Sequence, residues 1–258
     1  MRTTFAAAAL ACALTAAVST SGAQTPPPGA VQLVPNKAGK PSELRIDLGP
    51  GSLPASGEVP RSIVLASARG FRFDRRARRE TCSGAPAQDF ACPEGSRIGQ
   101  GSAEFLVRGP LLPAEGLADT ASIDVFIAPP PVSGDLFGVE VQVREQSFGV
   151  RQRGVGRLVP LPSGSFGSEL RFESVGSFEL PPGYSVELRR IQLNAGAKRT
   201  VRKTRTVVRN GRRRRATRRV RYHLIRNPRT CAGAWPYELR LGFAAGEERH
   251  PGEVPCTP

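Results

Sequence analysis

The sequence predicts an all-β fold: an antiparallel two-sheet β-sandwich, immunoglobulin-like or jelly-roll-like, with a projecting basic β-hairpin. Apolar and polar residues alternate in many short segments, which is the pattern of half-buried antiparallel strands. Glycine and proline account for 28 and 24 of the 258 residues, and short strands separated by such turn residues are typical of sandwiches. Four cysteines in the expected mature chain suit an exported domain braced by disulfides.

The N-terminal residues have the layout of a secretory signal peptide. Arg2 precedes an apolar run over residues 5–18, and small residues follow up to Ala23. This order predicts cleavage after Ala23. The competing interpretation, lipid attachment at Cys12, is disfavoured because Ala9 stands where such sites prefer leucine. The run is too short to span a bilayer, which needs about 20 residues. We therefore expect a secreted protein, extracellular or associated with the cell envelope, without a transmembrane segment.

The rest of the chain divides into a short leading segment and one large β-region. We expect residues 24–42 to form an N-terminal linker with the first strand, and residues 43–258 to form the sandwich. A proline-rich stretch at 129–135 leaves two arrangements open, a single domain or two subdomains divided there. Residues 198–222 are predicted to be a basic hairpin inserted into this domain.

Ten segments show the alternation, and turn signals such as Pro50-Gly51 separate them. In residues 137–145, for example, Val139, Val141 and Val143 share one face. A short stretch at 74–81 is the one helix candidate. The predicted strands are residues 43–48, 62–67, 70–74, 98–107, 121–128, 137–145, 156–161, 168–175, 184–193 and 237–243.

Glycines within the strand at 98–107 carry a further prediction. Gly99 and Gly101 interrupt the side-chain pattern of that segment. Glycine inside a strand indicates a bulge or the close approach of another backbone. A phosphate-binding loop is disfavoured because no helix is predicted to follow.

The four cysteines of the mature chain allow three disulfide pairings. We expect Cys82–Cys92 and Cys231–Cys256, since each pair closes a local loop. A metal site is disfavoured because the sequence has no Cys-x-x-Cys pair and only two histidines. No cofactor is expected.

Positive charge is concentrated in one segment of the chain. Residues 189–229 contain 17 of the 37 basic residues and no acidic residue, which leaves 20 basic and 22 acidic residues elsewhere. The sequence pI near 11 is therefore a property of this segment, and the remainder is nearly neutral. A smaller basic cluster comprises Arg69, Arg72, Arg75, Arg76, Arg78 and Arg79.

The basic segment reads as a hairpin around Asn210-Gly211, the dipeptide that best fits a type I′ turn. Both faces of such a hairpin are basic, so neither can lie on a core, and we expect it to project into solvent. The turn would pair Arg209 with Arg212, Thr204 with Thr217, and Val201 with Val220. The candidate polyanion-binding residues are Lys198, Arg199, Arg202, Lys203, Arg205, Arg209, Arg212, Arg213, Arg214, Arg215, Arg218, Arg219 and Arg221.

Two motifs resemble those of a known group of proteins. The CPxxSxIG stretch begins at Cys92, and the NPxTC stretch begins at Asn227. In this order they resemble uncharacterised secreted β-rich proteins and surface repeats of actinobacteria. The resemblance implies export and a β-rich unit, and it implies no catalytic residue. It also implies that the basic hairpin is an insertion, because the hairpin interrupts the short link expected before Asn227.

The sequence predicts no enzyme. His223 lies among arginines that disfavour the imidazolium, and His250 lies in a tail rich in glycine and proline. Glu169 and Glu173 flank Arg171 along a strand, which favours a salt-bridged surface over an acid/base pair. We therefore predict no catalytic residues.

Two functional hypotheses follow from the sequence. The first is a non-enzymatic structural or interaction protein of the cell envelope. The second is a polyanion binder that holds a wall polymer, phospholipid head groups or a nucleic acid backbone on the arginine-rich hairpin. Sequence-specific recognition of nucleic acid is disfavoured, because Tyr222 is the one aromatic residue among these cations.

Overall fold

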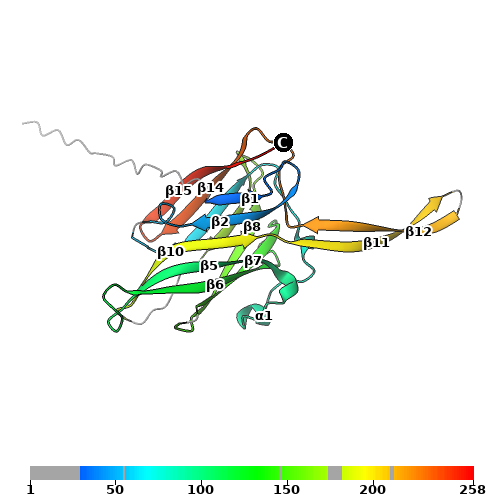
Figure 1. The fold of residues 1–258 in the computed structure, drawn as a ribbon. Helices are drawn as coiled ribbons and strands as arrows, with labels where there is room; N and C mark the ends of the chain where they lie inside the picture. The colour runs from blue at the N-terminus through cyan, green and yellow to red at the C-terminus, as the bar shows by residue number, and fades with distance from the viewer. Residues whose placement is uncertain (1–29, 55, 146, 174–181, 210–211) are drawn as a thin grey trace, which may run out of the picture.

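The protein is all-β and antiparallel in a computed structural model that describes residues 30–54, 56–145, 147–173, 182–209 and 212–258 (Figure 1). The predicted signal peptide (residues 1–23) and the predicted turn Asn210-Gly211 lie outside these residues. The strands are β1 (Val31–Val34), β2 (Pro41–Leu48), β3 (Ser62–Ala68), β4 (Arg72–Phe73), β5 (Arg97–Arg108), β6 (Leu117–Ala128), β7 (Phe137–Glu145), β8 (Arg151–Pro160), β9 (Phe166–Glu173), β10 (Ser185–Ala195), β11 (Lys198–Arg209), β12 (Arg212–His223), β13 (Ile225–Arg226), β14 (Ala234–Phe243) and β15 (Gly246–Pro255). Three short helical turns are η1 (Arg75–Ala77), α1 (Ala85–Gln88) and η2 (Glu94–Ser96).

Thirteen strands form one continuous hydrogen-bonded sheet. Its order is β15-β14-β3-β9-β8-β7-β6-β5-β10-β2-β13-β4, and β1 pairs with β2 off this path. The remaining two strands, β11 and β12, form a separate two-stranded ladder. Neighbours along the middle of the sheet, from β5 to β9, are also neighbours in sequence, as expected for a meander joined by short turns.

The sheet curls around a single apolar interior. Leu33 of β1 and Leu241 of β14 belong to one buried cluster, although β1 pairs with β2 near one end of the strand order and β14 lies near the other end. The last residues of the described chain meet the segment that joins β1 to β2. The Ala38 amide donates to the Thr257 carbonyl at 2.8 Å, beside an isolated parallel bridge.

The alternation of residues predicted most of these strands correctly. Each of the ten predicted segments contains a strand, although β4 keeps only two residues of the segment at 70–74. The helix candidate at 74–81 is reduced to the single 3₁₀ turn η1. The strand β1 lies within residues 24–42, where a first strand was expected, and the strands missed were β13 and β15. The placement of His250 in a tail loop was wrong, since it lies in β15 and is 4% exposed.

The two glycines of β5 occupy positions where another backbone passes close by. The pairing of β5 with β6 shifts register between Arg97 and Gly99, which is a bulge. A Cβ atom on Gly99 would lie 2.6 Å from the Asn194 carbonyl oxygen, and one on Gly101 would overlap the Gln192 carbonyl. The prediction of a bulge or a close backbone approach is confirmed.

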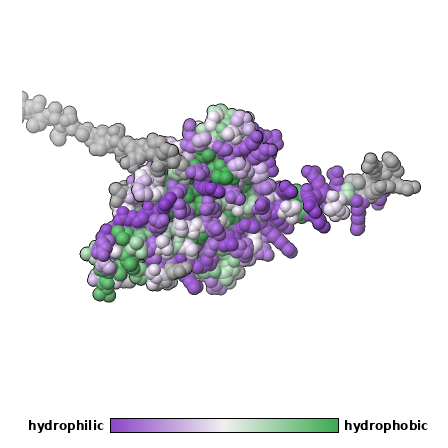
Figure 2. Space-filling view, in the orientation of Figure 1, coloured by the Kyte–Doolittle hydropathy of each residue, from purple (hydrophilic) through white to green (hydrophobic). Residues whose placement is uncertain are grey.

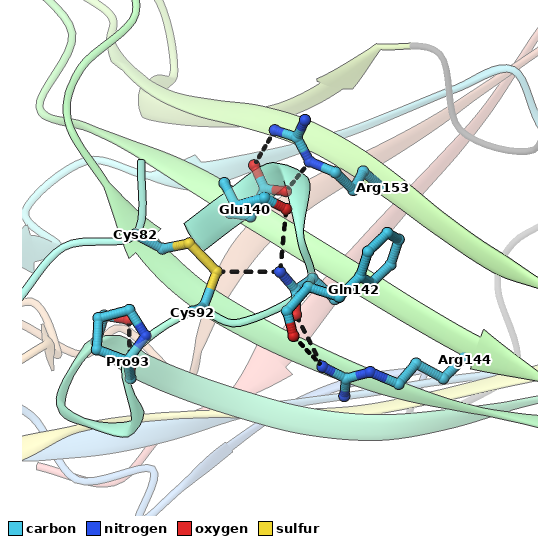
Figure 3. Close-up of a disulfide and its surroundings, with 10 residues drawn as sticks. Cys82, Cys92, Pro93, Glu140, Gln142, Arg144 and Arg153 are labelled. Carbon is cyan, nitrogen blue, oxygen red and sulfur yellow. Dashed lines mark hydrogen bonds and ion pairs between the residues drawn. A yellow bond between two sulfur atoms is a disulfide. The ribbon is translucent and has the colours of Figure 1, made fainter. Parts of the chain in front are cut away.

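The disulfide Cys82–Cys92 forms as predicted and closes a loop that contains α1 (Figure 3). This loop packs against the outer face of β7. The fully buried Gln142 side chain donates to Cys92 Sγ at 3.1 Å and to the Ala87 carbonyl at 3.4 Å. Arg144 donates to the Phe90 carbonyl at 3.0 Å. The disulfide and these bonds fix a loop that contributes few apolar side chains of its own.

The second predicted disulfide, Cys231–Cys256, also forms and joins the segment before β14 to the residue after β15. Trp235 lies in the core, with 5% of its surface exposed. Its ring meets Phe71 edge-on, with the ring centroids 5.7 Å apart. Its indole N–H donates to the Thr230 carbonyl at 2.9 Å. The disulfide therefore closes the open end of the β14–β15 hairpin, and the aromatic contact holds β14 to the body.

Candidate polyanion interface

The candidate interface is the ladder of β11 and β12, here called the basic ribbon. The two strands pair antiparallel, with Val201 opposite Val220 and Thr204 opposite Thr217. The Oγ1 atoms of the two threonines are 3.2 Å apart. Twelve residues per strand at about 3.3 Å each give a length of roughly 40 Å. In Figure 1 the basic ribbon extends away from the rest of the molecule.

Cations occupy both faces of the basic ribbon. Arg202 lies opposite Arg219, and on the other face Lys203 lies opposite Arg218. All four side chains are exposed. Like charges directly opposite one another destabilise a strand pair. The arrangement therefore costs stability in the isolated protein, and an anion lying along either face would relieve that cost.

The cations of the basic ribbon lack acidic partners within the described part of the chain. Salt bridges there join arginines of the body to Asp and Glu, as in Arg144–Asp124 and Arg190–Asp47, both at 2.7 Å. None of them involves a residue of β11 or β12 whose side chain is described. Many arginines of the body thus have acidic partners, whereas the described cations of the basic ribbon remain available to a ligand.

The base of the basic ribbon is anchored in the core. Val201 and Val220 pack against the central cluster, and Tyr222 is 9% exposed. The Arg76 guanidinium lies over the Tyr222 ring, 4.6 Å from its centroid, and Lys203 Nζ lies 5.6 Å from the same centroid. Cations over an aromatic face are attracted by its quadrupole. Tyr222 therefore joins the ribbon to the helical turn η1.

The turn η1 brings the smaller arginine cluster to the same place. Asp74 caps η1 by accepting from the Arg76 amide at 3.0 Å, and it accepts from the Arg76 guanidinium at 2.8 Å. These bonds from Arg76 lower the pKa of Asp74, against the opposing effect of burial. Arg75 and Arg79 are exposed beside this capped turn. The basic surface thus continues from the ribbon onto the body.

His223 ends β12, opposite Lys198. Burial lowers the pKa of His223, and the nearby Arg226, Arg221 and Lys198 lower it further. The sequence predicted this effect of the arginines on the imidazolium. The neutral form of His223 is therefore favoured at the base of the basic ribbon.

The predicted site residues all lie in β11 or β12, and ten of the thirteen have described side chains. Nine of these are exposed and Arg199 is half-buried; the side chains of Arg209, Arg212 and Arg214 lie outside the described residues. Sequence reasoning left the cluster around η1 out of the site. The sequence shows that arginines are frequent at 69–79, but the contact of this cluster with Tyr222 depends on the tertiary fold. The omitted neighbours are Arg72, Arg75, Arg76 and Arg79.

The acidic and histidine residues considered for catalysis have structural partners. Glu169 is 7% exposed and accepts from Arg171 and Arg240, at 2.6 Å and 2.5 Å. His250 lies 3.5 Å from Glu248, its neighbour on the same side of β15. The salt-bridged arrangement expected at Glu169 is present, and it ties β9 to β14.

Neither a metal cluster nor a membrane-spanning helix is found in the part of the chain that the structure describes. No three His, Cys, Asp or Glu side chains come close enough to hold an ion among the described residues. No described helix is long and apolar enough to cross a bilayer.

Comparison of the chain with protein-family models, with curated proteins and with solved structures finds no match.

Proposed function

We propose that the protein is an exported, non-enzymatic interaction module of the cell envelope, which holds polyanions on the basic ribbon. In this proposal the curled sheet acts as a two-layered sandwich, and the basic ribbon closes as a hairpin that projects from it. The observation that carries the proposal is the absence of acidic partners for the described cations of the ribbon, although many arginines of the body have such partners.

The chemistry of the side chains favours a ligand with repeated phosphate or carboxylate groups. Arginine presents planar, bidentate donors that suit both anions. Cations along both faces of a ribbon roughly 40 Å long match an extended polymer or a head-group surface better than a single small anion. Outside the cell such anions are wall polymers, phospholipid head groups and released nucleic acid. Backbone contacts of this kind carry no sequence information.

A shortened ribbon tests the proposal directly. Residues 202–219 are deleted and Asn-Gly is inserted between Val201 and Val220, whose Cα atoms are already paired across the ladder. The base with Tyr222 stays intact, so we expect unfolding at nearly the same temperature as for the full chain. Binding to immobilised heparin and to duplex DNA at low salt should be lost. Undiminished binding by this variant would place the interface elsewhere.

Two variants with the same net charge separate a local site from overall charge. The first replaces Arg202, Arg218 and Arg219 with Gln, and the second replaces the exposed body arginines Arg45, Arg61 and Arg151 with Gln.

We expect the first variant to weaken DNA binding and to flatten its dependence on salt. Each lost phosphate contact should lower the slope of log K against log[salt] by roughly 0.9. The second variant should bind like the wild type. Equal weakening by both would mean that total charge, and not the ribbon, drives binding.

A further inference from the structure

The interior of the curled sheet contains two apolar cavities, of about 130 Å³ and about 90 Å³. Val125, Phe172 and Leu193 line both of them, so they are neighbouring compartments of one interior. Protein interiors usually contain few voids larger than a water molecule. An apolar cavity of about 150 Å³ stays dry and takes up a small apolar molecule such as benzene. The size and lining of this interior are therefore those of an apolar binding site.

Apolar side chains that face the larger cavity are incompletely buried. On β7, Val141 and Val143 point inward, opposite in direction to Glu140 and Gln142, yet both remain half-buried. Phe172 of β9 is half-buried in the same cavity. In a close-packed core these side chains would be covered on all sides. Their remaining accessible surface is the surface a ligand would cover.

A glycine on β8 keeps part of this space open. Gly154 lies opposite Val141 and lines the larger cavity. A Cβ atom at Gly154 would have Val141 Cβ as its nearest neighbour, at the ordinary distance of 3.8 Å, and its φ is not positive. By contrast, a Cβ atom at Gly156 would collide with the Phe172 ring. Glycine inside a strand costs stability. Neither sterics nor backbone conformation requires glycine at position 154, and the missing side chain leaves space in the larger cavity.

The lining restricts the chemical class of the ligand. Gln152 and Arg153 are the polar residues among those that line the larger cavity, and the Arg153 guanidinium is bound by Glu140 at 2.5 Å. The smaller cavity has Ser67 and the rings of Trp235 and Tyr237 as its lining residues with polar atoms, and none of the three is charged. No charge in the described lining is left to hold an ionic group. We propose that the two compartments bind a single unbranched alkyl chain, such as the acyl chain of a fatty acid or a lipid.

Dodecanol tests this site, because it carries the chain without a charge that the basic ribbon could attract. We expect the full chain to bind dodecanol at one molecule per protein, measured by native mass spectrometry and by titration calorimetry. Bound dodecanol should also raise the unfolding temperature, since a ligand that binds the folded state alone stabilises it. Failure of the wild type to bind dodecanol would overturn the proposal.

A matched pair of variants locates the binding. Gly154→Leu places a side chain in the cavity, whereas Val155→Leu adds bulk one residue away at an exposed position. We expect Gly154→Leu to bind dodecanol at least tenfold more weakly, and to unfold at the same or a higher temperature without ligand. Val155→Leu should bind like the wild type. Unchanged binding by a folded Gly154→Leu variant would rule out the cavity.

A second comparison distinguishes the source of the chain. Dodecanoate and vesicles of dioleoylphosphatidylglycerol are offered separately to the shortened-ribbon variant, which lacks most of the competing cations. Capture of dodecanoate alone would assign a free fatty acid as ligand, and extraction of the phospholipid would assign a membrane lipid. Capture of neither would overturn the acyl-chain assignment even if dodecanol binds.

Discussion

The buried carboxylate of Glu140 depends on one partner. Glu140 is 3% exposed, and Arg153 binds both of its oxygens, at 2.5 Å and 3.0 Å. Removing one member of a buried ion pair leaves the other charge uncompensated, which costs about 3–5 kcal/mol. The pair itself contributes little to stability, but the loss of Arg153 would leave the buried charge of Glu140 uncompensated.

Arg153→Ala should therefore lower the free energy of unfolding in urea by about 3 kcal/mol or more. Arg151→Ala is the control, since Arg151 is exposed on the same strand and such substitutions usually change stability by less than about 0.5 kcal/mol. Similar losses for the two variants would show that Glu140 finds another partner or water when Arg153 is absent.

His223 predicts a pH dependence of stability. Its pKa is lowered in the folded state, first by burial and then by neighbouring cations. The unfolded chain therefore binds a proton more readily, and folding stability is fully present above the ordinary pKa of about 6.5. We expect stability to fall as the pH drops from about 6.5 through the lowered pKa.

His223→Gln should flatten this part of the profile, measured as the midpoint of urea unfolding between pH 7 and pH 5. His250→Gln is not a matched control, because His250 is buried in β15. Comparison with the wild type at each pH suffices. A variant with the same slope as the wild type would show that His223 does not cause it.

The basic ribbon is the element whose own positive charge lowers its stability. Arg202 and Arg219 face each other across the ladder. Arg219→Glu converts this pair into an attractive one and should stabilise the ribbon by roughly 0.2–1 kcal/mol. Slower amide hydrogen exchange in β11 and β12 would measure the gain.

The same substitution should weaken polyanion binding, because it removes one cation and adds an anion. Arg219→Gln should lie between the wild type and Arg219→Glu in both measurements. If Arg219→Glu both stabilised the ladder and strengthened polyanion binding, relief of the repulsion between the strands would not be what favours the ligand.

The sequence revealed most strands because their alternation reflects one buried face. The strand β15 was missed for a physical reason: it is an edge strand, and of its residues only His250 and Val254 are buried. Edge positions tolerate proline and charge, so Gly246–Pro255 reads as a loop. The strand β13 was missed because its two residues are too few for a period to appear.

For the molecule as a whole, the segregation of charge was predictable and the surroundings of the basic ribbon were not. Counting residues identifies the cations of β11 and β12 as a set. The approach of Arg76 to Tyr222 arises from the packing of segments about 150 residues apart in sequence. The curl of the sheet is likewise non-local, because β3 pairs with β9 and β14. Such pairings leave no periodic trace in either strand alone.

The contact of the last residues with the segment after β1 has a consequence for how the fold can be cut. Lys37 and Thr257 form a bridge, and the Thr257 amide donates to the Asn36 carbonyl at 3.1 Å. A circular permutant that links Pro258 to Ala30 by a glycine-serine linker long enough to run the length of β1, and opens at the exposed Ser133-Gly134 turn, should therefore keep both disulfides and a cooperative melting transition. A permutant that fails to fold would show that the order in which β6 and β7 are made matters more than the nearness of the ends.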